Sequence, residues 1–110
     1  MSTFFSTGSK RTYTDFKKQV PLQVQSLLDS LREFCFSLGG NVIEDVRMHR
    51  IAFCKSITFR WFVDIEPEKD SILLKIQRSR KESQKIIRLK PNESLDSIKI
   101  ILKEAFETVH

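Results

Sequence analysis

The sequence predicts an α+β fold in which two helices cover one face of an antiparallel sheet of four or five strands. The evidence is that the spacing of apolar residues changes twice along the chain. Apolar residues recur every three or four positions near both ends of the chain and every second position between them. Each predicted helix has one apolar stripe, and the most regular strand has one apolar face. The expected architecture is therefore a two-layer sandwich with the N-terminal and C-terminal helices on the same side of the sheet.

The length and composition favour a single domain. A chain of 110 residues with 40% hydrophobic residues can bury one core. Residues 1–12 are expected to form a flexible tail, because they show no period that could pack a face, and residues 13–110 form the α+β domain. The start of the chain lacks the apolar core of a signal peptide, and no run approaches the ~18 to 20 apolar residues of a membrane span. These features favour a soluble, cytoplasmic protein.

The first helix is predicted from Pro21 onward. Pro21 suits a first helical turn, and Gly39 and Gly40 suit a left-handed cap at its end. The apolar stripe consists of Val24, Leu27, Leu28, Leu31, Phe34, Cys35 and Leu38.

Strands follow the first helix. Residues 42–46 and 50–55 are short candidates, and residues 57–65 alternate most regularly. Taking Trp61 as a residue that faces the helices, Arg60, Phe62 and Asp64 are expected on the opposite face. Whether the later basic residues share that outer face depends on a register that the sequence does not settle.

The remaining elements complete the pattern. Pro67 ends the regular strand, residues 68–70 form a turn, and residues 72–76 alternate again as a hairpin partner. Residues 85–89 form a further strand candidate. After Pro91, Asn92 or Ser94 can cap a last helix. Its stripe consists of Leu95, Ile98, Ile101, Leu102, Ala105, Phe106 and Val109.

Positive charge is concentrated between residues 75 and 90. This segment has a net charge of +6, whereas the whole chain has +5. Clustered lysines and arginines are typical of contact with a polyanion, although many such runs are only solvated surface. The nucleic-acid-binding hypothesis therefore includes Lys75, Arg78, Arg80, Lys81, Lys85, Arg88 and Lys90, with Arg60 as a further cation and Phe62 as a stacking platform.

Competing interpretations remain open at this point. The leading one is a non-enzymatic binding module that contacts DNA or RNA, alone or beside a DNA-processing protein. A module that docks on another protein or on anionic lipid headgroups is the first alternative. A homodimer built by edge-strand pairing is also compatible with the pattern, so the oligomeric state is left open.

The residues expected of an enzyme or a metal site are sparse. Only two histidines and three glycines are present, which leaves no Ser-His-Asp arrangement and no glycine-rich phosphate loop. We therefore expect no catalytic residues, no cofactor and no metal. A metal-dependent nuclease using Asp64 and Glu66, with Asp45 as a third ligand, is the weaker alternative. Cys35 and Cys54 both sit among apolar residues, as thiols of a core do.

The sequence also resembles an uncharacterised family of small α+β domains, found alone or at the C-terminus of endonuclease-like proteins. The similarity lies in Val24 to Gly39 with Asn41 to Asp45, in Phe62 to Lys69, and in Ser94 to Ala105. It covers roughly residues 13–108 and departs between Gln77 and Lys85. The resemblance implies the fold and an association with DNA-processing proteins, and it supplies no catalytic residues.

Overall fold

The fold class predicted from the sequence is confirmed. The computed structural model describes residues 11–56, 60–79 and 81–109, and most of the expected tail lies outside these ranges. Three helices, α1 (Tyr13–Lys18), α2 (Leu22–Ser37) and α3 (Asp96–Thr108), flank five strands. The strands are β1 (Ile43–Val46), β2 (Ile51–Cys54), β3 (Trp61–Pro67), β4 (Ile72–Ile76) and β5 (Lys85–Leu89). They form one antiparallel sheet in the order β1-β2-β3-β4-β5.

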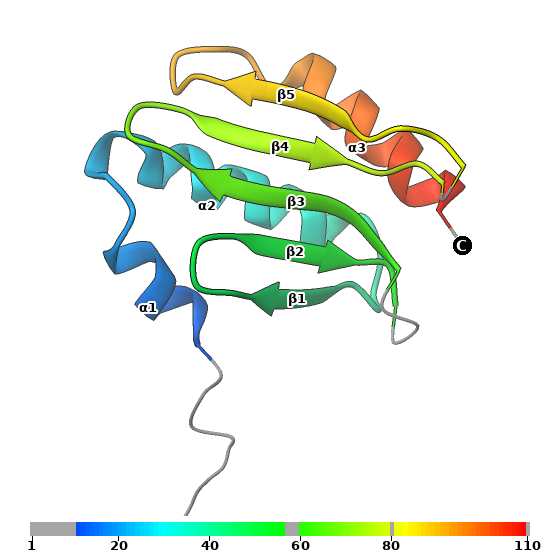
Figure 1. Ribbon diagram of the computed structural model, residues 1–110, viewed down its shortest axis with the longest axis horizontal. Helices are drawn as coiled ribbons and strands as arrows, with labels where there is room; N and C mark the ends of the chain where they lie inside the picture. The colour runs from blue at the N-terminus through cyan, green and yellow to red at the C-terminus, as the bar shows by residue number, and fades with distance from the viewer. Residues whose placement is uncertain (1–10, 57–59, 80, 110) are drawn as a thin grey trace, which may run out of the picture.

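Two helices cover one face of this sheet. Figure 1 shows α2 behind the first strands and α3 behind β4 and β5, so the face toward the viewer carries no helix among the described residues. We call this uncovered side the outer face. The core between the layers is apolar and includes Leu28 and Leu31 of α2, Ile65 of β3, and Leu102 of α3, all at most 1% exposed. Burial of these stripes explains why the helices lie on the same side.

The short helix α1 precedes the helix predicted from Pro21. The hydroxyl of Thr12 accepts a hydrogen bond from the backbone amide of Asp15 and caps α1. Asp29 of α2 then holds α1 in place, because it accepts hydrogen bonds from the Tyr13 hydroxyl at 2.5 Å and from the Lys17 ammonium at 2.7 Å. Although burial opposes it, these two bonds keep the pKa of Asp29 below its usual range.

A β-bulge in β3 overturns one expectation about its faces. Phe53 of β2 pairs with Val63, but the next residue, Cys54, pairs with Trp61, so Phe62 is an extra residue on β3. Phe62 is fully buried and its ring meets Phe106 of α3 edge to face at 5.3 Å. Trp61 is only half-buried and lies on the outer face with Asp64. The prediction that Trp61 faces the helices and Phe62 faces outward is therefore wrong.

Gly39 has a different role from the one expected. Neither Gly39 nor Gly40 has a φ in the left-handed region, so the predicted left-handed cap is absent. A Cβ atom on Gly39 would instead lie 2.7 Å from the tip of the Phe106 ring, whereas one on Gly40 would meet nothing within 4 Å. Gly39 is thus required for the close approach between the end of α2 and the last turn of α3.

The start of α3 also departs from expectation. Its N-cap is Leu95, without a side-chain cap, rather than Asn92 or Ser94. Ser94 still accepts a hydrogen bond from the amide of Asp96 at 3.2 Å. Both cysteines are free and buried. None of the described helices has the length and hydrophobicity to cross a membrane.

Candidate nucleic-acid interface

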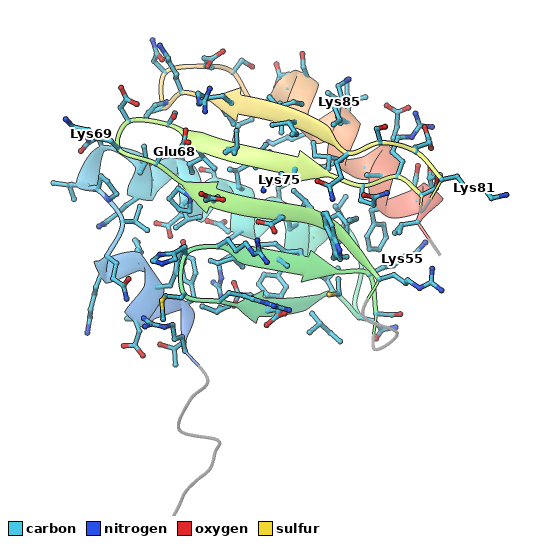
Figure 2. The ribbon with its side chains drawn as sticks, in the orientation of Figure 1. Lys55, Glu68, Lys69, Lys75, Lys81 and Lys85 are labelled. Atoms are coloured by element: carbon cyan, nitrogen blue, oxygen red, sulfur yellow. The ribbon has the colours of Figure 1, made fainter. Side chains whose placement is uncertain are left out.

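The antiparallel strands divide the basic residues between the two ends of the sheet. The connections β2–β3 and β4–β5 lie at one end, and the β3–β4 turn and the end of β5 lie at the other. Figure 2 shows Lys81 and Lys85 toward one end and Glu68 and Lys69 at the opposite end. Arg88 and Lys90 belong to the opposite end, because β5 runs away from Lys85 by about 3.4 Å per residue. The predicted cluster is therefore not one patch.

One end of the sheet holds four of the eight predicted cations, together with Lys55. We call Lys55, Arg60, Arg78, Lys81 and Lys85 the basic end. Lys55 and Arg60 are joined by a backbone hydrogen bond of 3.0 Å at the β2–β3 connection. In the neighbouring loop, Arg78 lies 4.0 Å from Glu82, a half-exposed ion pair worth little. Within the described residues, Lys81 and Lys85 have no carboxylate at ion-pair distance, so their charges stay available to a partner.

At the opposite end, one cation, Arg88, is neutralised by a carboxylate. Arg88 donates to both carboxylate oxygens of Glu68, at 2.9 and 3.4 Å. The Arg88 guanidinium beside it holds the pKa of Glu68 below its usual range. A polyanion would have to compete with this bidentate pair, which makes Arg88 a weaker candidate than Lys81 or Lys85.

A hollow opens on the outer face beside the basic end. It has a volume of about 230 Å³ and is lined by Arg47, Arg50, Ala52, Trp61, Asp64, Lys75 and Gln84. We call it the outer-face hollow. Figure 2 shows Lys75 near the middle of the sheet. Gln84 also lines the hollow and belongs to the β4–β5 connection, which carries Arg78 and Lys81, so the hollow and this part of the basic end adjoin. Lys85 pairs with the buried Ile76, so its side chain starts from the helix-covered face of the sheet.

The bulge brings two residues of this hollow together. Trp61 and Asp64 are three positions apart, and a regular strand would place them on opposite faces. The extra residue Phe62 puts both on the outer face. Bulges often re-aim side chains next to functional sites.

Asp64 has an unusual environment in the hollow. The residue is only 8% exposed, and its Oδ1 atom is buried without a hydrogen-bond partner among the described residues. Its Oδ2 atom lies 3.3 Å from Nε of Arg50. Burial raises the pKa of Asp64 above its ordinary value, while Arg50 and Lys75 oppose that rise. A buried acceptor without a donor is costly for folding.

The structure places the predicted site residues in different parts of the molecule. Lys75 lies in the hollow, whereas Arg60, Arg78, Lys81 and Lys85 lie at the basic end and Arg88 and Lys90 at the opposite end. Phe62 is wrong as a stacking platform because it is buried. Arg80 lies outside the described residues. Sequence reasoning missed Trp61, Arg47 and Arg50. A signal for the bulge existed, since Trp61, Phe62 and Val63 are three consecutive apolar residues that interrupt the alternation.

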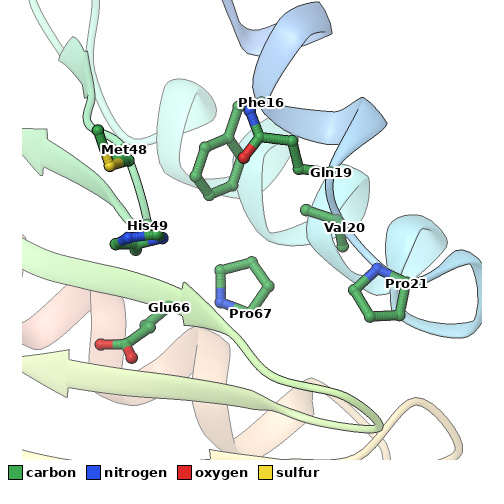
Figure 3. A pocket seen from close by; sticks show the side chains of 8 residues that line it. All are labelled: Phe16, Gln19, Val20, Pro21, Met48, His49, Glu66 and Pro67. Carbon is green, nitrogen blue, oxygen red and sulfur yellow. The ribbon is translucent and has the colours of Figure 1, made fainter.

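A second hollow lies on the other side of the β1–β2 turn. Its volume is about 220 Å³. Figure 3 shows Phe16 of α1 with Val20 and Pro21 of the α1–α2 connection on one side, and Met48 and His49 of the β1–β2 turn with Glu66 of β3 on the other. His49 is exposed. This hollow has no cluster of cations, so it adds nothing to a polyanion site.

The carboxylates of the weaker nuclease hypothesis are dispersed. Asp64 and Glu66 share the outer face, as their spacing requires, and Asp45 is engaged by Arg47 at 2.8 Å. Within residues 11–56, 60–79 and 81–109, no group of three or more potential ligands could hold a metal ion.

Comparison of the chain with protein-family models, with curated proteins and with solved structures finds no match. The family resemblance described above therefore stays a prediction.

Proposed function

We propose that this chain is a non-enzymatic module that binds single-stranded DNA or RNA. The observation that carries the proposal is the position of Trp61, the only tryptophan, on an uncovered sheet face beside the basic end. Aromatic side chains stack on unpaired bases, and neighbouring cations bind the phosphates. On this proposal the module acts alone or beside a DNA-processing protein, as the family resemblance implies.

The two parts of the surface have complementary roles. Lys81 and Lys85 have no carboxylate at ion-pair distance among the described residues, so phosphate binding there would release condensed counterions without breaking an existing ion pair. Trp61 in the adjoining hollow offers a surface to one base. A duplex keeps its bases stacked inside and cannot use this surface, so single strands are the preferred ligand.

The decisive experiment uses charge-neutralised variants in a salt titration. Arg78→Gln, Lys81→Gln and Lys85→Gln are combined, and binding of a fluorescein-labelled octathymidine is followed by anisotropy at several salt concentrations. Each lost phosphate contact should make the slope of log affinity against log salt shallower by about 0.7. We expect weaker binding and a slope shallower by up to about 2.

A matched variant combines Lys69→Gln, Lys90→Gln and Lys103→Gln. It removes the same charge from exposed positions outside the basic end, and its binding should change much less. Equal affinity in the wild type and the basic-end variant would contradict the proposal. Sedimentation with acidic vesicles, in the absence of any oligonucleotide binding, would replace it by the lipid-docking alternative.

A further inference from the structure

We propose that the outer-face hollow recognises a single unstacked guanine base, with the Asp64 carboxylate accepting hydrogen bonds from the Watson–Crick edge of that base. The inference rests on the proposed function and adds base selectivity to it. It starts from the unpaired Oδ1 atom, because a buried acceptor that the fold leaves without a donor among the described residues is suited to a donor on a ligand.

The arrangement of charges in the hollow matches guanine better than the other bases. Guanine alone presents two adjacent donors, N1–H and the N2 amino group, which fit the two oxygens of a carboxylate. Cytosine and adenine place a ring-nitrogen acceptor next to their amino group, and thymine and uracil flank one imino donor with two carbonyl acceptors. In either arrangement an acceptor of the base would face a carboxylate oxygen, which is also an acceptor, and no hydrogen bond could form there.

The other groups in the hollow suit the remaining edge of guanine. Its O6 and N7 atoms are acceptors that arginine and lysine bind most often. Arg47, Arg50 and Lys75 line the same hollow as Asp64. Arg50 approaches only Oδ2, and the side chains of Arg47 and Arg50 are 56% and 45% exposed. Oδ1 is shielded in the free protein, so binding of a base there requires neighbouring side chains to move.

The size of the hollow and its wall point to one base. Its volume of about 230 Å³ is below the ~300 to 1,000 Å³ of pockets that enclose drug-sized ligands. Trp61 supplies an aromatic wall for stacking, and the phosphates of the strand then extend past Gln84 toward the basic end.

The test compares octathymidines that differ at one central position, which is thymine, guanine, inosine, adenine or cytosine. Inosine lacks the 2-amino group of guanine and keeps its other edge atoms. Anisotropy should show the guanine oligonucleotide binding roughly 5- to 150-fold more tightly than octathymidine, the range of one bidentate base contact. The inosine oligonucleotide should bind less tightly than the guanine oligonucleotide, because it offers one donor fewer to the carboxylate. This comparison tests the base contact without any change to the protein.

Variants assign the selectivity to Asp64. Asp64→Asn should remove the preference for guanine while the salt-dependent binding of octathymidine remains. Glu66→Gln is the matched control, because Glu66 lies on the same strand and face but does not line the hollow, and it should keep the preference. Circular dichroism would confirm that both variants are folded.

The outcomes separate the inference from the proposed function. Salt-sensitive binding with equal affinity for all five oligonucleotides would overturn guanine recognition and leave the binding module intact. A guanine preference that persists in Asp64→Asn would likewise overturn the role of Asp64. Failure to bind any of the oligonucleotides would overturn both proposals.

Discussion

At the scale of single residues, burial determines which side chains are available for chemistry. Cys35 is fully buried in α2, and burial, reinforced by Glu44, raises the pKa of its thiol to about 12. The thiolate is the reactive form of cysteine, so Cys35 is a packing residue rather than a nucleophile in the folded protein.

This burial predicts a loss of stability at high pH. Above about pH 8.5 the unfolded thiol releases its proton while the folded thiol keeps it, so the folded state binds more protons. The free energy of unfolding should therefore fall as pH rises toward 12, by about 1.4 kcal/mol per pH unit from this group. Urea unfolding at pH 8 and pH 10 measures this fall in the free energy of unfolding.

The contribution of Cys35 is isolated by comparing two variants. Cys35→Ala should show a smaller loss of stability between pH 8 and pH 10 than the wild type. Cys54→Ala retains Cys35 and should keep the part of the loss that comes from it. The same pH dependence in the wild type and in Cys35→Ala would contradict the assignment.

Among the residues of the candidate site, only part was predictable from sequence. Arg78, Lys81 and Lys85 of the β4–β5 hairpin are exposed, and the sequence could indicate them because charge is visible in composition. Trp61 and Phe62 were assigned to the wrong faces, since a strict two-residue period holds only while both strands contribute one residue per pair. The bulge breaks that condition between Phe53 and Cys54.

At the scale of elements, the close approach of α2 and α3 depends on one glycine. Gly39→Ala would place a Cβ 2.7 Å from the Phe106 ring, which also packs on Phe62. Overpacking of this kind typically costs about 1 to 3 kcal/mol. Reduced flexibility of the unfolded chain offsets about 0.4 to 1 kcal/mol of that cost. We expect a net destabilisation of about 1 kcal/mol in urea unfolding.

Gly40→Ala provides the matched control for this contact. It makes the same chemical change one residue later, where an added Cβ meets nothing within 4 Å. Its stability should equal or slightly exceed that of the wild type. Equal losses in both variants would show that backbone freedom, rather than the Phe106 contact, is what these positions require.

The strands and helices were more predictable than their ends. The predicted strands at 42–46, 50–55, 72–76 and 85–89 match β1, β2, β4 and β5 within about one residue. The early part of the predicted 57–65 strand, residues 57–59, lies outside the described residues. The caps were predicted less well: Gly39 is set by a tertiary neighbour, Phe106, and the N-cap of α3 lies one residue after Ser94, within the usual uncertainty of helix ends.

At the scale of the whole molecule, the sandwich leaves one sheet face uncovered, and the proposed ligand would bind there only in the folded state. A ligand of this kind stabilises the protein by mass action, by about 2.7 kcal/mol at 100 times its dissociation constant. For a domain of this size the melting temperature should rise by roughly 10 °C.

Thermal unfolding with and without saturating guanine-containing octathymidine measures this rise. The basic-end variant, with Arg78, Lys81 and Lys85 changed to Gln, should show a much smaller shift at the same oligonucleotide concentration. The variant with Lys69, Lys90 and Lys103 changed should keep the shift. Equal shifts in the two variants would indicate that the ligand binds elsewhere on the protein.

By itself, the sequence determined the fold class, the order of the elements and the concentration of positive charge, because hydrophobic period and composition are local properties. Only the tertiary structure decided which basic residues lie together and which residues share the outer face. The extended strand β5 runs from Lys85 to Leu89 and so separates Lys85 from Lys90, and one extra residue, Phe62, places Trp61 on the same face as Asp64. The shared face of Trp61 and Asp64 depends on strand register, and register arises from long-range contacts between strands.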